Sequence, residues 1–263
     1  MRRASQRAAI AELMPISGTL DVATLLEDAP VMDGYGAEPW AIAGVETLQV
    51  AFEIDERAMP GPLPPALHPT IPPTLMISVT RYPESPVGPF TLAQARLGCR
   101  AAALPRGFLL RACVDSQMAA DALGHNWGYR CAVGVVRVQR YHDRITGSAH
   151  TDGVEILRAS LIDPTPISGG DIQYVANMNL ARVRGEDGGA LIQVDPEYTF
   201  HRAERGRPEL TAFDRAAWRA DGVDPVWPIV ASFTTCDSGF PRIRFVLDPL
   251  RPAVAGTRRV DGG

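Results

Sequence analysis

The densest group of polar and aromatic side chains lies at residues 125–129 (HNWGY), and Cys131 follows two residues later. His125 can titrate near neutral pH. A cysteine acts as a nucleophile or weak acid when a nearby cation or histidine lowers its pKa. Acid–base or nucleophilic chemistry is therefore one interpretation of this segment. The alternative is a surface turn with Trp127 packed beneath it and a cysteine that only fills apolar space.

The chain contains no lysine, and all 26 of its basic residues are arginine. No side chain can therefore form an imine with a carbonyl substrate, and only the N-terminal α-amino group is a primary amine. An arginine can instead hold a carboxylate by a two-pronged contact. Arg81 and Arg100 are candidates for that task, and the alternative for each is an outward-facing ion pair.

Residues 172–184 carry three amide side chains, at the odd-numbered positions 173, 177 and 179. Successive side chains of a strand point to opposite faces, so Gln173, Asn177 and Asn179 share one face. This pattern predicts a strand that lines a polar pocket, with Asn177 among its contacts. The alternative is the solvent-facing side of an edge strand.

The rest of the pattern predicts a protein rich in β-strands. The 24 glycines and 23 prolines are as expected when many strands need many turns. Ser116 is expected to cap a helix over 116–123 that Gly124 ends. Strands are expected at 45–54, 74–82, 90–102, 108–115, 131–141, 154–162, 172–184, 190–200, 226–232 and 243–247.

Composition excludes several classes of function. The formal net charge is −4, and no basic stripe interleaves with aromatic residues, so nucleic-acid binding is not expected. No apolar run reaches the roughly 20 residues that span a bilayer. The basic start is not followed by a signal-peptide core, so we expect a cytoplasmic protein with no membrane partner. Reduced thiols are the default for the four cysteines of an intracellular protein, and no His or Cys pair has the spacing of a zinc site. We therefore expect no metal, and we also expect no cofactor.

From about Val45 to Leu250 the chain resembles the acetoacetate decarboxylase superfamily. The segments that carry the resemblance occur in the family's order over roughly 200 residues. They are 45–52 (VETLQVAF), 88–91 (GPFT), 112–116 (ACVDS) with the helix at 119–123, 126–129 (NWGY), 201–208 (HRAERGRP) and 240–242 (FPR).

The resemblance implies a mainly β (α+β) fold, a closed, cone-shaped antiparallel β-barrel with a few flanking helices and an internal pocket. It also implies a homo-oligomer. Residues 1–44 are then an N-terminal extension packing on the barrel, 45–250 the family domain and 251–263 a C-terminal tail.

The family's chemistry uses two adjacent lysines, one of which forms an imine with the substrate. Aligning the Trp-Gly-Tyr segment with the family motif puts Cys131 and Ala132 at these two positions, so the chain is a divergent member without the Schiff-base pair. The family's glutamate falls on Leu92. The resemblance and the residue patterns above together give Tyr129, Cys131 and Glu53 as candidate catalytic residues. The candidate substrate-binding residues are Gln94, Arg81, Arg100, Trp127, His125, Leu92 and Asn177.

These features predict an enzyme of specialised small-molecule metabolism that acts on a carbonyl or carboxylate metabolite. The chemistry is lysine-independent acid–base catalysis: decarboxylation, dehydration, enolisation or cyclisation. Tyr129 or Cys131 is the acid, and Glu53 is the base in an apolar cavity that raises its pKa. One alternative is a non-catalytic protein that binds a small molecule. Another is a covalent enzyme that uses Cys131.

Overall fold

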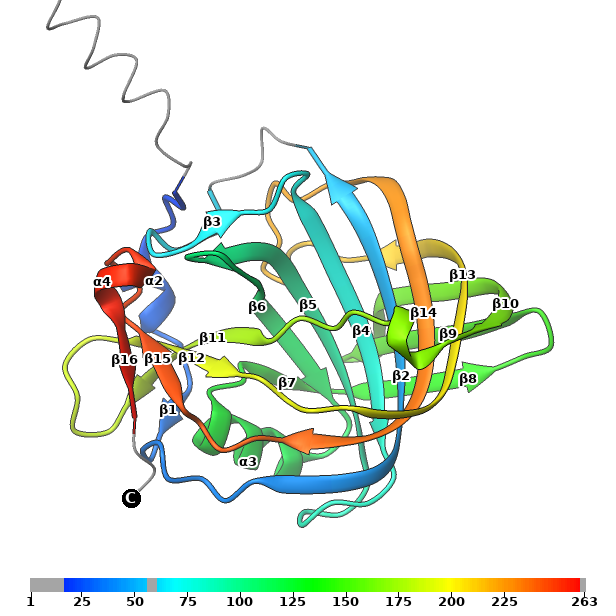
Figure 1. Ribbon diagram of the computed structural model, residues 1–263, viewed down its shortest axis with the longest axis horizontal. Coiled ribbons are helices and arrows are strands. Elements are labelled where there is room, and N and C mark those ends of the chain that lie inside the picture. Colours follow the sequence, from blue (N-terminus) through cyan, green and yellow to red (C-terminus); the bar gives the residue numbers. More distant parts are fainter. Residues whose placement is uncertain (1–16, 56–60, 261–263) are drawn as a thin grey trace, which may run out of the picture.

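The computed structural model describes residues 17–55 and 61–260, and these residues fold mainly into β-strands (Figure 1). The helices are α2 (Val22–Leu26), α3 (Gln117–Trp127) and α4 (Ala253–Gly256), with a 3₁₀ turn, η2 (Gly169–Asp171). The strands are β1 (Val31–Met32), β2 (Trp40–Ile54), β3 (His68–Pro69), β4 (Thr74–Tyr82), β5 (Phe90–Ala101), β6 (Leu104–Val114), β7 (Cys131–Val133), β8 (Val135–Arg140), β9 (Arg144–Thr151), β10 (Val154–Ile167), β11 (Asn177–Val183), β12 (Ala190–Val194), β13 (Thr199–Phe213), β14 (Pro225–Phe240), β15 (Phe245–Leu247) and β16 (Thr257–Arg259).

The strands form one curled sheet in the order β16-β15-β12-β11-β6-β5-β4-β2-β14-β13-β10-β9-β8. Most neighbours are antiparallel, whereas β7 and β11 run parallel to β6, and β1 runs parallel to β11. In the described part of the chain the end strands β16 and β8 are not neighbours, so the sheet does not close as expected. Instead, β8 and β9 fold back and contact β4 and β5, and this contact buries apolar surface that closure would otherwise cover.

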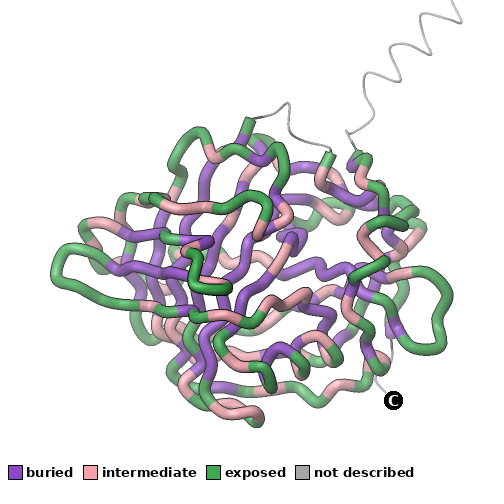
Figure 2. The backbone as a smooth tube through the Cα atoms, turned by 180° about the vertical axis from the view of Figure 1, so that it is seen from behind, coloured by how far each residue is buried: buried purple, intermediate pink, exposed green. Residues whose placement is uncertain are grey.

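The central strands have two different faces because their side chains alternate. Leu48 and Val50 on β2 join an apolar core with Ile145 and Leu157 from β9 and β10. Gln49, between them, is buried on the opposite face. Figure 2 shows how the buried residues follow these central strands, while the loops are exposed. The same alternation places Ser78 and Thr80 of β4, and Gln94 and Arg96 of β5, on the face of Gln49.

Helix α3 begins at the expected cap, where the Ser116 side chain accepts a hydrogen bond from the Ala119 N–H at 3.3 Å. The expected end at Gly124 is wrong. The helix continues to Trp127, and Gly128 (φ 67°) ends it in the left-handed region that favours glycine. A Cβ at Gly128 would lie 2.8 Å from the Ala181 Cβ, so close packing also favours glycine here.

Other expected boundaries also need correction. The strand expected at 172–184 begins only at Asn177, and β9 and β13 were not expected as strands. Residues 141–143, between β8 and β9, form a short exposed turn. The sequence does not predict β13 because charged residues, Gly206 and Pro208 interrupt its apolar pattern. In the structure Pro208 nevertheless lies opposite Leu161 of β10 within the sheet.

The sheet extends beyond the domain bounds expected from the sequence, since β2 begins at Trp40 and β16 ends at Arg259. Residues 1–16 of the expected N-terminal extension lie outside the described residues. None of the helices in the described ranges has the length and apolar character needed to cross a membrane.

A buried carboxylate ties β8 to β13. Both oxygens of Glu204 accept hydrogen bonds from Arg140, at 2.6 and 2.8 Å, and Arg202 donates to the same carboxylate at 3.0 Å. The hydrogen bonds from Arg140 lower the pKa of Glu204. Only 3% of the Glu204 side chain is exposed, so removing its charge leaves Arg140 without its main partner.

We predict that Glu204→Gln lowers the free energy of unfolding by about 2 kcal/mol, a value that allows for the partial exposure of Arg140. Because the folded pKa of Glu204 is lowered, its contribution is present above about pH 4.3, the ordinary glutamate value, and is lost as the pH falls below it. Urea unfolding at pH 7 and pH 3 measures both effects. Glu209→Gln, on the exposed side of the same strand, is the control. Equal free energies of unfolding for the two variants at pH 7 would contradict the stabilising role of the Glu204 carboxylate.

Candidate functional site

A small internal chamber of about 40 Å³ lies on the polar face of β2, β4 and β5, under β11 and the aromatic residues that flank it. Its lining combines amides, hydroxyl groups, aromatic rings and one guanidinium. The lining residues are Val45, Thr47, Gln49, Ser78, Thr80, Tyr82, Gln94, Arg96, Tyr129, Tyr174, Val175, Asn177, Val194, Pro196, Tyr198, Ser238, Gly239 and Phe240.

A larger hollow of about 980 Å³ adjoins the chamber, and the two share Pro196, Ser238, Gly239 and Phe240 as lining residues. Its walls carry the carboxylates of Asp195, Glu197 and Asp237 and the guanidinium groups of Arg242 and Arg244. Because the two share lining residues, the chamber borders directly on the larger hollow.

The guanidinium of Arg96 lies at the centre of the chamber and is held by neutral groups. Its Nη1 donates to Asn177 Oδ1 at 2.8 Å and to the Val175 carbonyl at 3.3 Å. Its Nη2 donates to Gln49 Oε1 at 2.9 Å and to Ser78 Oγ at 3.5 Å. Its Nε–H is buried and has no protein partner. One donor of Arg96 is therefore left without a protein acceptor.

Asn177 connects Arg96 to two other polar side chains. While its Oδ1 accepts from Arg96, its Nδ2 donates to Gln94 Oε1 at 2.7 Å and to the Tyr129 hydroxyl at 3.0 Å. An oxygen that accepts from an amide keeps its own proton for donation. The network therefore orients the Tyr129 hydroxyl and leaves its proton available to a ligand.

Four tyrosines surround this network. Tyr174 hydrogen-bonds through its hydroxyl to Thr234 at 2.9 Å, and Tyr198 packs edge-on against Tyr174 with ring centres 5.1 Å apart. Burial raises the pKa of Tyr174 to about 12 and also raises the pKa values of Tyr82, Tyr129 and Tyr198 well above the ordinary value. These phenols therefore remain neutral hydrogen-bond donors through neutral pH.

The charge of the chamber is unbalanced. Of the described residues that line it, Arg96 is the single ionic group, and none is Asp, Glu, His or Lys. Burial lowers the pKa of Arg96, but a guanidinium stays charged in proteins. A buried charge is costly unless an opposite charge or well-placed hydrogen bonds compensate it. The chamber is therefore suited to a small anion.

The structure brings three of the predicted site residues into the chamber, namely Tyr129, Gln94 and Asn177. Two others, Leu92 and Trp127, are fully buried in the apolar core behind it. The Trp127 indole donates to the Pro241 carbonyl at 2.7 Å, which fixes the end of α3 just before Tyr129. Trp127 and Leu92 thus support the chamber wall without lining it.

The other five predicted residues lie outside the chamber. The Arg81 side chain is 55% exposed and pairs with Glu46 at 3.1 Å, which is the outward ion pair considered as its alternative. His125 is exposed on α3. Glu53 is near the end of β2, opposite Thr74, and Arg100 is near the end of β5, opposite Pro105.

Cys131 lies on β7, opposite Ala112 of β6, and does not line the chamber. Burial raises the pKa of its thiol to about 12. This environment disfavours the reactive thiolate.

Arg96 is the important residue that the sequence analysis missed. A signal for it exists, because Arg96 is two residues after Gln94 and therefore shares its face of the strand, and its neighbours Ala95 and Leu97 are apolar. An arginine inside an otherwise apolar strand is unusual unless it is paired or functional.

A family model and several solved structures match this chain. Residues 28–217 match the model of the family described as acetoacetate decarboxylase. The acetoacetate decarboxylase of Legionella pneumophila aligns with a TM-score of 0.72 at 17% identity, over 90% of this chain and 93% of that one. No curated protein matches the chain in sequence.

Two further structures share the fold. The enduracididine biosynthesis enzyme MppR, solved with pyruvate, aligns with a TM-score of 0.63 at 17% identity, over 77% of this chain and 88% of that one. An acetoacetate decarboxylase-like enzyme from Sphingomonas wittichii aligns with a TM-score of 0.57 at 14% identity, over 78% and 92%. The family model covers most of the chain, and the fold agrees. The chain belongs to the acetoacetate decarboxylase family.

Proposed function

We propose that this protein is an enzyme that binds a small oxo acid or related carboxylate in the chamber and acts on it without an imine. The observation that carries the proposal is the buried Arg96 guanidinium, which has neutral partners and an unpaired Nε–H. The structure of MppR with pyruvate supports the ligand class, because pyruvate is a small oxo acid and that enzyme has the same fold.

The lining favours one type of reaction. Dehydration, enolisation and cyclisation each need a base that removes a proton, and the described lining residues include no carboxylate, imidazole or amine. Decarboxylation needs no such base. In a 3-oxo carboxylate the bond between the carboxylate carbon and C2 breaks, CO₂ leaves, and the electron pair forms an enolate that takes up one proton at C2.

Two residues of the chamber suit these steps. Arg96 offers its Nε–H and its positive charge to the oxygen on which the enolate charge develops, and a donor fixed in a dry site stabilises such charge strongly. Tyr129 supplies the proton, since burial keeps its hydroxyl neutral and Asn177 orients it. Solvent water, entering through the adjoining hollow, restores that proton.

A non-catalytic small-molecule binding protein is the second candidate. The absence of a base from the described lining of the chamber favours it, because an anion can rest against Arg96 without any bond changing. Covalent catalysis by Cys131 is not part of the proposal, since the thiol lies away from the chamber and its pKa is raised. A homo-oligomeric state remains a prediction from the family resemblance.

The first test is turnover by the wild-type protein and by Arg96→Gln. We expect proton NMR to show conversion of a member of a panel of 3-oxo acids to ketone and CO₂, with deuterium entering C2 when the solvent is D₂O. Loss of a fixed donor to an oxyanion costs about 10²–10³-fold in kcat, so Arg96→Gln should show at least that reduction. Arg81→Gln, which removes an exposed guanidinium of β4, should keep wild-type activity.

The same experiment separates the two candidates. Saturable ligand binding without conversion, lost in Arg96→Gln and kept in Arg81→Gln, would support the binding protein. Turnover that survives Arg96→Gln would contradict the role of Arg96 in either candidate.

The second test concerns the proton donor. We predict that Tyr129→Phe lowers kcat by about 10²-fold or more, the usual contribution of a positioned acid, while Tyr141→Phe at the exposed β8–β9 turn has no effect. Because the pKa of Tyr129 is raised, its donating form persists as the pH rises through 10. The contrary result would be a wild-type rate that falls between pH 8 and 9.5, with no such fall in Tyr129→Phe. It would show that Tyr129 loses its proton in that range and is not a donor whose neutral form persists to pH 10.

A further inference from the structure

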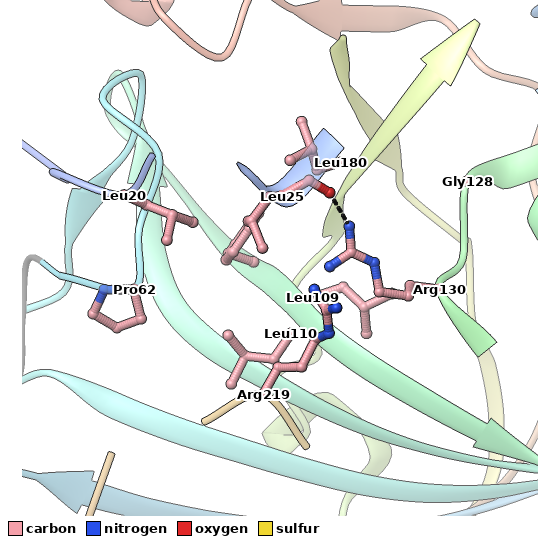
Figure 3. A pocket seen from close by; sticks show the side chains of 10 residues that line it. Leu20, Leu25, Pro62, Leu109, Leu110, Gly128, Arg130, Leu180 and Arg219 are labelled. Carbon is pink, nitrogen blue, oxygen red and sulfur yellow. Dashed lines mark hydrogen bonds between the residues drawn. The ribbon is translucent and has the colours of Figure 1, made fainter. Parts of the chain in front are cut away.

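A second hollow lies apart from the chamber, between α2, β6 and the turn that follows β13. It has a volume of about 50 Å³ and shares no lining residue with the chamber. Figure 3 shows it from close by, with leucine side chains and the guanidinium groups of Arg130 and Arg219 around it. The leucines are Leu20, Leu25, Leu109, Leu110 and Leu180. We call this hollow the leucine–arginine slot.

The arginine side of the slot has more positive than negative charge. Arg130 lies 3.4 Å from Asp28, and Arg219 pairs with the same carboxylate. A third guanidinium, that of Arg111, donates to the Ala217 carbonyl at 3.2 Å, and its buried Nε–H has no protein partner. Two cations of the slot, Arg130 and Arg219, thus share one carboxylate, and Asp28 is itself half exposed.

Arg130 is the most buried of the charged side chains that line the slot, with 13% of its side chain exposed. It donates to the Leu25 carbonyl at 2.5 Å, so one of its donors is used to hold α2. Burial, together with the charge of Arg219, lowers the pKa of Arg130 to about 10. The cation is therefore under-compensated, and an added negative charge in the slot would stabilise it.

We propose that the leucine–arginine slot binds a short straight-chain carboxylic acid, with the carboxylate on Arg130 and Arg219 and the hydrocarbon chain along the leucines. Two guanidinium groups match the planar carboxylate. Burial of a hydrocarbon chain against the leucines is favourable, and the small volume of the slot limits the length of that chain. This site goes beyond the proposed function and does not depend on it.

Isothermal titration of the full chain with acetate, butanoate, hexanoate and octanoate tests the proposal. We expect affinity to rise about threefold to fourfold per added methylene, as for burial of a CH₂ group, until the slot is full. Inorganic phosphate and methyl hexanoate should bind far more weakly than hexanoate, because the first lacks the tail and the second lacks the charge. Equal affinity for acetate and hexanoate, or for hexanoate and its ester, would overturn the proposal.

Variants locate the binding. Arg219→Gln should weaken hexanoate binding about tenfold or more, while Arg215→Gln should not, since Arg215 pairs with Asp224 in the same turn and does not line the slot. Arg96→Gln should leave hexanoate affinity unchanged, which separates the slot from the chamber. Leu25→Ala keeps the charges and should reduce the gain per methylene, and circular dichroism confirms that each variant is folded. Hexanoate binding that survives both Arg219→Gln and Leu25→Ala in folded protein would contradict the site.

Discussion

The architecture around the chamber depends on one constraint, the burial of the Arg96 guanidinium. A charge that is 6% exposed must find hydrogen-bond acceptors. Gln49 on β2, Ser78 on β4 and Asn177 on β11 supply them from three separate strands. The side-chain alternation that turns these groups toward Arg96 also turns Leu48, Val50 and their neighbours into the apolar core on the opposite face.

In the function that we propose, this buried positive charge takes the place of an imine. The family resemblance puts Cys131 where an imine-forming lysine is expected, but the thiol lies outside the chamber. A fixed guanidinium, an oriented phenol and three amides remain. Such a site can stabilise negative charge and donate a proton, which defines the chemistry that we propose for it.

The sequence predicts the sheet well and the chamber only in part. β4 has the bounds expected from its pattern, and Ser116 caps α3 as expected, because both depend on local preferences. Side-chain alternation also predicts that Asn177 and Asn179 share one face of their strand. Side-chain alternation does not show which face of each strand lines the chamber.

The missing information is long-range. Arg96 and Asn177 are 81 residues apart, and only the curl of the sheet brings them together. Tyr174 lies in an irregular segment where no strand period applies, and its position depends on Thr234. The end of α3 at Gly128 depends on contacts of Trp127 and Ala181, which local sequence does not reveal.

The most direct test of the anion-binding role of Arg96 is a ¹⁵N–¹H NMR spectrum of the arginine Nε–H groups. The Arg96 signal is identified by its loss in Arg96→Gln. We predict that this signal shifts saturably when 4-oxopentanoate, an oxo acid that does not lose CO₂, is added, because the carboxylate or carbonyl oxygen accepts from the unpaired Nε–H. An Arg96 signal that stays unchanged at saturating ligand would contradict the central role of this residue.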